Sequence, residues 1–251
     1  MQLDLEGKVA LVTGGSRGIG QAIALKLAAH GASVAINYLR KGAQASEVAA
    51  TIRAHQVRSL TIQANVASPE EVERMFQTLK TEFGRLDILI SNAASGVLRP
   101  ALELKPRHWQ WTMEINAGTL LPLAQQAVPL MPEGGSIVAV SSLGAIRAIP
   151  NYTAVGASKA ALESLVRHLA AELAPRGIRV NALSAGVVDT DALKHFPNRT
   201  DLLSESARRT PAGRLVTPDD VADAALFLVS PLASMVIGQT LVVDGGYSIL
   251  G

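Results

Sequence analysis

The chain has 251 residues, of which 48% are hydrophobic and 4% are aromatic, and its formal net charge is +2. That length is enough for one α/β domain with a large core, while the scattered Lys and Arg side chains argue against a nucleic-acid-binding surface. The chain has no cysteine, which excludes disulfides, thiolate catalysis and a zinc–cysteine site.

The first residues carry no sign of a targeting segment. Residues 1–15 include acidic side chains where a secretory signal would have basic ones, and their apolar run is short. No uncharged apolar run reaches the length that crosses a bilayer. We therefore expect a soluble cytoplasmic protein.

Strand-like and helix-like segments alternate along the chain. Short apolar, β-branched runs predict strands at 8–14, 33–38, 59–66, 86–94, 135–142, 178–186 and 238–246. Apolar residues at helical spacing predict helices at 18–31, 42–55, 68–84, 106–131, 152–174 and 217–230. This alternation predicts an α/β fold with a doubly wound parallel sheet of the Rossmann type. Since no linker divides the sequence, we expect one domain over residues 1–251.

Local signals refine two of these helices. The third predicted helix has Ser68 as its N-cap, followed by Pro69 in the first turn and Glu71 three residues after the cap. Pro122 and Pro129 are expected to bend the long fourth helix.

The segment 187–216 is irregular and polar, and it carries Pro197 and Pro211. It follows the carboxyl end of a predicted strand, the edge at which ligands enter sheets of this kind. We expect it to form a lid over a substrate.

A glycine-rich stretch, TGGSRGIG at 13–20, separates the first strand from the first helix. Gly14, Gly18 and Gly20 would let backbone approach a pyrophosphate, and the helix start offers N–H groups and the positive end of its dipole. The alternative is an ordinary tight turn. The placement between strand and helix favours dinucleotide binding.

The end of the second strand indicates which dinucleotide. Sites for NAD usually have a carboxylate there, on the ribose hydroxyls. This chain instead has Asn37, Tyr38, Arg40 and Lys41, and Arg17 lies in the glycine-rich stretch. Cations suit a 2′-phosphate, so we expect NADPH; the alternative is that these cations only form a solvated turn. Polar residues after the next two strands are placed to reach the adenine (Asn65) and the ribose or nicotinamide (Asn92).

Tyr152 and Lys159 are seven residues apart on one predicted helix, so nearly two full turns place them on one face. Many nucleotide-dependent reductases have Tyr four residues before Lys, where this chain has Val155. Lys159 can hold the nicotinamide ribose and lower the pKa of the phenol, and Tyr152 can donate a hydrogen bond to a substrate oxygen. The alternative is that Tyr152 caps the helix and Lys159 is a surface charge.

The longer spacing moves the phenol about 5 Å along the helix. A phenol beside the hydride-accepting carbon serves carbonyl reduction. A phenol one turn away can stabilise an enolate oxygen while hydride enters a carbon two bonds off, as in conjugate reduction of an enoyl thioester.

Over the whole chain these motifs resemble the short-chain dehydrogenase/reductase family, and the Tyr–Lys spacing resembles its enoyl reductase branch. Three longer blocks are similar to the type III enoyl-[acyl-carrier-protein] reductases: NAASGVLRPALEL (92–104), SSLGAIRAIPNYTAVGASKAALE (141–163) and DTDALKHFPNR (189–199). The resemblance implies NADPH-dependent reduction of a trans-2-enoyl thioester in fatty acid biosynthesis, with Tyr152 and Lys159 as the catalytic pair. It also implies a homotetramer packed through the two long helices.

The resemblance, with the motifs above, also implies a full set of site residues. The catalytic set adds Ser142 and Asn116; the family's Asn kinks the long helix and joins a proton-relay water, although a purely structural role is an equal alternative. Where Asn65 stands, the family often has Asp. The cofactor contacts are expected from Gly14, Ser16, Arg17, Gly18, Ile19, Gly20, Asn37, Tyr38, Leu39, Arg40, Asn65, Val66, Asn92, Ala93, Ala94, Lys159, Gly186, Val188 and Thr190.

Ser142 keeps a second reaction open. It lies thirteen residues before Val155, the spacing at which the family's ketoreductases place a carbonyl-binding Ser before their Tyr. The leading hypothesis is therefore an enoyl-thioester reductase acting on acyl groups carried by acyl carrier protein or coenzyme A. The alternatives are a reductase of 3-oxoacyl thioesters or other carbonyls, and a non-catalytic protein that senses NADPH.

The remaining candidates carry weaker expectations. The histidines are dispersed and none pairs with a carboxylate at ligand spacing, so we expect no metal site. Asp189 or Asp191 is expected to cap a helix of the lid, and at least one of Trp109 and Trp111 to lie in a core or an interface. A basic rim could dock an acidic carrier protein or simply be solvated; its members are Arg147, Lys194, Arg199, Arg208 and Arg209.

Overall fold

The computed structural model describes residues 3–189 and 199–250. All seven expected strands are present, and they form one parallel sheet in the order β3-β2-β1-β4-β5-β6-β7. The doubly wound sheet is therefore confirmed. The strands are β1 (Val9–Val12), β2 (Ser33–Tyr38), β3 (Ser59–Gln63), β4 (Ile88–Ser91), β5 (Gly135–Ser142), β6 (Ile178–Ala185) and β7 (Thr240–Val243).

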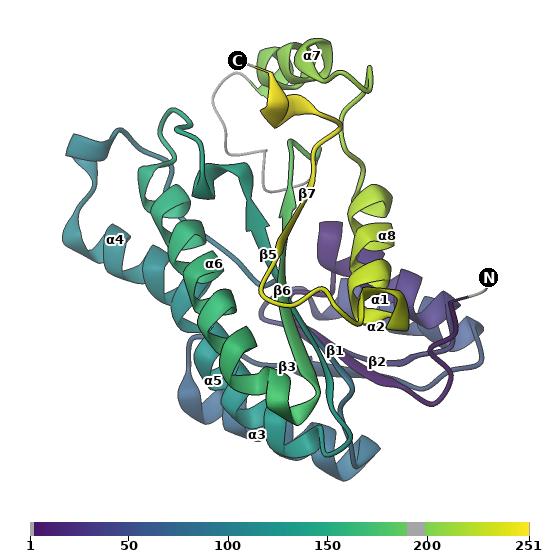
Figure 1. The fold of residues 1–251 in the computed structure, drawn as a ribbon. Helices are drawn as coiled ribbons and strands as arrows, with labels where there is room; N and C mark the ends of the chain where they lie inside the picture. The colour runs from purple at the N-terminus through teal and green to yellow at the C-terminus, as the bar shows by residue number, and fades with distance from the viewer. Residues whose placement is uncertain (1–2, 190–198, 251) are drawn as a thin grey trace.

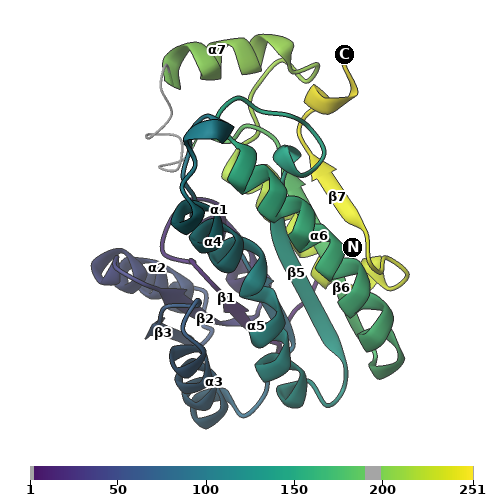
Figure 2. The ribbon, with the colours of Figure 1, turned by 90° about the vertical axis from the view of Figure 1, so that its left-hand side faces the viewer.

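Helices cover both faces of the sheet (Figures 1 and 2). One face carries α1 (Gly18–Ala29), α2 (Gly42–Ala54) and α8 (Pro218–Val229), and the other carries α3 (Pro69–Phe83), α4 (Pro106–Met113), α5 (Leu120–Ala127) and α6 (Thr153–Leu173). Alternate residues of a strand serve opposite cores: in β1, Leu11 packs on the α6 side and Val12 on the α1 side. Such two-sided burial explains why the strands read as continuous apolar runs.

The long helix expected at 106–131 is not continuous. A π-helical turn at Glu114–Gly118 separates α4 from α5, so the bend falls at Asn116 rather than at a proline. Pro122 lies in the first turn of α5, and Pro129 lies in a terminal 3-10 turn, two places where a missing N–H costs little.

The start of α3 is confirmed: the Ser68 hydroxyl accepts a hydrogen bond from the Glu71 N–H at 3.3 Å. The segment 187–216, expected to be an irregular lid with a helix in it, contains the helix α7 (Arg199–Arg209). Its ends are joined by a bridge between Val188 and Val216. In both views α7 lies beyond the carboxyl ends of the central strands (Figures 1 and 2).

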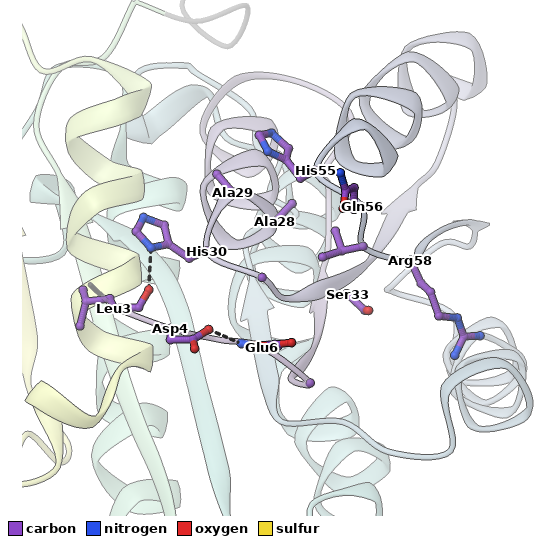
Figure 3. Close-up of a pocket in the computed structure, with 13 residues that line it drawn as sticks. Leu3, Asp4, Glu6, Ala28, Ala29, His30, Ser33, His55, Gln56 and Arg58 are labelled. Atoms are coloured by element: carbon purple, nitrogen blue, oxygen red, sulfur yellow. Dashed lines mark hydrogen bonds between the residues drawn. The ribbon is translucent and has the colours of Figure 1, made fainter. Parts of the chain in front are cut away.

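A groove of about 720 Å³ opens at the opposite edge, beside the amino ends of β1, β2 and β3 (Figure 3). Its lining includes Leu3, Asp4, His30, His55 and Arg58, and His30 Nδ1 lies 2.7 Å from the Leu3 carbonyl oxygen. None of the site residues expected from the sequence lines this groove, so it lies apart from the phosphate loop.

Asp87, just before β4, joins several groups at this amino-terminal edge. Its buried carboxylate accepts hydrogen bonds from the Val9 N–H at 2.9 Å and from the Arg85 guanidinium at 2.7 and 3.1 Å. These bonds tie the start of β1 to the start of β4.

Asp87→Ala should lower the free energy of unfolding by about 1–3 kcal/mol, because it leaves the buried Val9 N–H without an acceptor. Urea denaturation measures this loss. Glu82→Ala is the control, since the Arg58–Glu82 ion pair is exposed, at 4.0 Å, and should contribute less than about 1 kcal/mol. Equal effects of the two substitutions would contradict the role given to Asp87.

Candidate active site

The strand order reverses between β1 and β4, and hydrogen bonds join the ends of these two strands. The Thr13 hydroxyl accepts from the backbone N–H groups of Asn92 and Ala93 at 2.9 and 3.0 Å. The Asn92 side-chain amide donates to the carbonyls of Thr13 and Gly14 at 2.9 and 3.2 Å. Asn92 thus braces the glycine-rich loop at the point where doubly wound sheets bind ligands.

The three loop glycines are required by geometry. Gly14 and Gly18 have φ values of +64° and +55°, which side chains other than glycine rarely adopt. A Cβ on Gly20 would overlap the Asn92 amide and lie 2.5 Å from the Gly14 carbonyl oxygen. The first turn of α1 carries no acidic side chain. The loop and the helix start therefore fit the pyrophosphate of a dinucleotide.

The side chain of Asn37 points inward. It is 2% exposed; its oxygen accepts from the Gly14 N–H at 3.4 Å, and its nitrogen donates to the Ala64 carbonyl at 2.9 Å. Asn37 therefore fastens the glycine-rich loop to the ends of β2 and β3. The outward positions after β2 are Leu39, Arg40 and Lys41, all exposed.

The other expected cofactor residues lie along the same carboxyl edge. Asn65 follows β3, and its side-chain oxygen accepts from the Ala67 N–H at 3.1 Å. Gly186 and Val188 follow β6, and the Gly186 N–H donates to the Val243 carbonyl at 2.9 Å. The expected residues that lie outside the described part of the chain are Thr190, Asp191 and Lys194.

Tyr152 and Lys159 are brought together with the end of β5. Tyr152 is the residue just before α6, and its hydroxyl is hydrogen-bonded to that of Ser142 at 3.3 Å. Lys159 is only 6% exposed, and its Nζ donates to the Val140 carbonyl at 2.8 Å. The interpretation of Lys159 as a surface charge is therefore wrong.

Two glycines form a slot for the Tyr152 ring. A Cβ on Gly144 would lie 2.5 and 2.6 Å from two ring carbons, and a Cβ on Gly156 would lie 2.7 Å from the Gly144 carbonyl oxygen. The ring therefore packs directly on backbone. Any larger residue at 144 would displace the phenol.

The position four residues before Lys159 is closed. Val155 is 7% exposed, and a Cβ on Gly96 would overlap its Cγ2. The segment that contains Gly96 is held by Asn116, whose oxygen accepts from the Ser95 N–H at 3.0 Å. The Asn116 amide also donates to the Ser158 hydroxyl at 3.0 Å. Asn116 does lie in the bend of the long helix, as expected.

Burial governs the charge of both catalytic candidates. It raises the pKa of Tyr152, with the Ser142 hydrogen bond acting in the opposite direction. The expected lowering of this pKa by Lys159 is therefore wrong: the phenol stays protonated at neutral pH. Burial lowers the pKa of Lys159 to about 8, against the raising effect of the Glu163 carboxylate.

Sequence reasoning missed several residues that shape this site, namely Thr13, Gly96, Gly144, Gly156 and Glu163. A signal existed for two of them, because Gly156 follows Tyr152 by one helical turn and Gly144 lies in the short link between Ser142 and Tyr152. Thr13, Gly96 and Glu163 act through tertiary contacts that no local sequence pattern predicts.

The weaker expectations have mixed outcomes. No group of three or more metal-ligating side chains occurs within residues 3–189 and 199–250. Trp109 and Trp111 are 43% and 46% exposed, so neither lies in the core. Among the rim residues, Arg208 pairs with Glu205 at 2.7 Å, and Arg209 lies over the Tyr247 ring. In the described residues, no helix is long and apolar enough to cross a membrane.

Comparison with known proteins identifies relatives over the full fold. A 1-cyclohexenylcarbonyl-CoA reductase of Streptomyces collinus is 41% identical over 97% of this chain and 88% of its own length. An enoyl-[acyl-carrier-protein] reductase [NADH] FabI of a Nostoc strain is 39% identical over 99% of both chains. The structure of the Bacillus cereus enoyl-acyl carrier protein reductase with NADP⁺ and indole naphthyridinone superposes with a TM-score of 0.94, at 34% identity and 100% coverage of both chains.

The model of one protein family covers almost the whole chain, from residue 14 to residue 248. That family is described as enoyl-(acyl carrier protein) reductase, and its members are oxidoreductases that use a nicotinamide cofactor. The protein belongs to this enoyl reductase family, within the short-chain dehydrogenases/reductases.

Proposed function

We propose that this protein reduces the trans-2 double bond of enoyl thioesters with NADPH. One observation carries the proposal. The phenol of Tyr152 is locked one turn before the usual Tyr position by Gly144, and that position is filled by Val155 packed under Gly96. The only phenol of this helix is therefore displaced about 5 Å along its axis.

The proposed roles follow from the chain's own groups. When bound, the nicotinamide supplies a hydride to the β-carbon of the enoyl group. The Tyr152 hydroxyl, protonated at neutral pH, donates a hydrogen bond to the thioester oxygen as negative charge develops there. Ser142 orients that hydroxyl through their 3.3 Å hydrogen bond. Lys159 holds the ribose hydroxyls and so fixes the cofactor beside Tyr152.

The choice of NADPH rests on the cations at the end of β2. Arg40 and Lys41 are exposed there, and Arg17 is exposed in the glycine-rich loop, at positions suited to a 2′-phosphate. The named relatives differ in this respect, since the Nostoc relative is named for NADH and the Bacillus cereus structure contains NADP⁺. The remaining cofactor contacts proposed are those expected from the sequence, with Asn37 acting indirectly by holding the loop.

The wider setting is also a proposal. The relatives named for carrier-protein and coenzyme A substrates support an acyl thioester substrate. With it we propose a role in fatty acid biosynthesis and a cytoplasmic location. We assign residues 1–251 to one domain, with the described part of 187–216 as the substrate lid. Apolar side chains exposed on α4 and α5 support a homotetramer through these helices and α6; they are Trp109, Trp111 and Leu121.

One observation favours a second candidate, a carbonyl reductase. Ser142 retains the ketoreductase position and is hydrogen-bonded to the phenol, so a ketone oxygen placed beside them would meet both hydroxyls. The direct test compares NADPH oxidation with a short trans-2-enoyl thioester and with the matching 3-oxoacyl thioester. Turnover of the enoyl substrate alone supports the proposal, and a preference for the 3-oxo substrate would overturn it.

Tyr152→Phe should lower kcat for the enoyl thioester by about 10²-fold or more, because the thioester oxygen loses its hydrogen-bond donor. The ring keeps its slot against Gly144, so the Kd for NADPH should remain unchanged. Steady-state kinetics and a fluorescence titration measure the two quantities. Near-normal turnover would show that Tyr152 is not the donor.

Arg40→Ser should lower kcat/KM for NADPH by about tenfold or more and leave that for NADH unchanged, because only NADPH loses a charge-assisted contact. Arg53→Ser is a matched control, since Arg53 is exposed in the last turn of α2, the helix that begins two residues after Arg40. Equal losses with both cofactors would place Arg40 outside the 2′-phosphate site.

Val155→Tyr combined with Tyr152→Phe restores the usual four-residue spacing. We expect this double variant to lose enoyl reduction without gaining carbonyl reduction, because a phenol at 155 meets the backbone at Gly96. Assays of the variant with both thioesters measure the two activities, and circular dichroism verifies that it is folded. Efficient 3-oxoacyl reduction by the variant would mean that spacing alone selects the reaction.

A further inference from the structure

A buried carboxylate lies one helical turn beyond Lys159. Glu163 is 7% exposed, and its Oε1 accepts a hydrogen bond from the Ser141 hydroxyl at 2.6 Å. Leaving an ionisable side chain inside the protein is costly unless it is partnered, so this placement calls for an explanation. Neither the cofactor site nor the phenol uses Glu163 directly.

The same strand holds Lys159 and Glu163 through neighbouring residues. Lys159 donates to the carbonyl of Val140, and Ser141, the next residue of β5, donates its hydroxyl to Glu163. The end of β5 therefore fixes the ammonium and the carboxylate side by side on α6. Ser142, which follows, bonds the phenol.

Burial favours the neutral amine of Lys159, and the nearby carboxylate opposes this by favouring the ammonium. Glu163 is the charged group that acts on Lys159. Strand β5 and the 3-10 turn after it contribute only uncharged residues. The ionisable residues on the other elements that pack against α6 are Arg107 and His108 on α4, Glu114 on the π turn, Arg176 on the 3-10 turn after α6, and Arg179 on β6. Arg179 donates to carbonyls at the end of α8.

We propose that Glu163, held by Ser141, is a positioning residue that keeps Lys159 charged and therefore able to hold the cofactor. The inference rests on the proposed function only in assigning the ribose to Lys159. It predicts that removing the Glu163 carboxylate weakens NADPH binding at alkaline pH, because the Lys159 amine then loses its proton at a lower pH.

Glu163→Gln tests this, since the amide oxygen can still accept from Ser141 while the charge is lost. The Kd for NADPH, measured by fluorescence between about pH 6 and pH 9, should rise with pH from a point about one unit lower than in the parent protein. Near pH 6 the two proteins should bind equally, and near pH 8 the variant should bind several-fold more weakly. A loss that is the same at every pH would overturn the proposal and leave Glu163 a structural role.

Two further variants serve as a control and as a second test of the role of Glu163. Glu172→Gln removes an exposed carboxylate from the same helix and should leave the pH profile unchanged. Ser141→Ala should shift the pH profile of NADPH binding in the same direction but less, because the carboxylate loses the hydroxyl that holds it. If Glu163→Gln does not fold, the pH profile of Ser141→Ala tests the proposal instead. The titration needs no turnover, so a shifted profile in a protein inactive on enoyl thioesters would support this inference while refuting the proposed function.

Discussion

The contact on which the active site depends is that between the Tyr152 ring and the backbone of Gly144. Two ring carbons lie so close to Gly144 that a Cβ there would approach them to 2.5–2.6 Å. The residue before α6 thereby acquires a fixed side-chain position, which an aromatic residue at a helix start does not ordinarily have. Because β5 ends only two residues earlier, the same contact sets the phenol of Tyr152, seven residues before Lys159, against Ser142.

Burial then determines what the placed groups can do. It raises the pKa of Tyr152 and lowers that of Lys159, so both side chains are pushed toward their uncharged forms. A protonated phenol suits hydrogen-bond donation to a developing enolate, the role expected of Tyr152, although the expected lowering of its pKa by Lys159 is absent. The lysine needs an external source of charge stabilisation, and Glu163 is the group placed to give it.

The sheet and the glycine-rich loop could be predicted from the sequence because local chemistry specifies them. Continuous apolar runs require strands covered on both sides, and glycine is demanded at Gly14 and Gly18 by positive φ. The residues of the long helix by themselves place its break at the prolines, and only the family resemblance indicated Asn116, where the π turn lies. The bounds of the helix α7 could not be predicted either, because its residues are mostly polar.

Some site residues could likewise be predicted from local sequence, whereas others depend on tertiary contacts. Tyr152 and Lys159 could be paired from helical periodicity alone, yet the closure of position 155 depends on Gly96, which is distant in sequence. Asn37 shows the limit most clearly. Its type and position suggest a ligand contact, whereas its side-chain amide is hydrogen-bonded inside the protein to the backbone of Gly14 and Ala64. A polar residue at a strand end is equally suited to bind a ligand or to hold the loop that does, and only tertiary structure distinguishes the two.

Asn116 connects the two halves of the active site. Its buried side chain accepts a hydrogen bond from the Ser95 N–H and donates one to the Ser158 hydroxyl, which in turn donates to the carbonyl of Val155 at 2.6 Å. The loop after β4 and the helix that carries Lys159 are therefore positioned by one side chain. Since that loop places Gly96 against Val155, the bend in the long helix helps to close position 155, where a carbonyl-reducing enzyme of the family would have its Tyr.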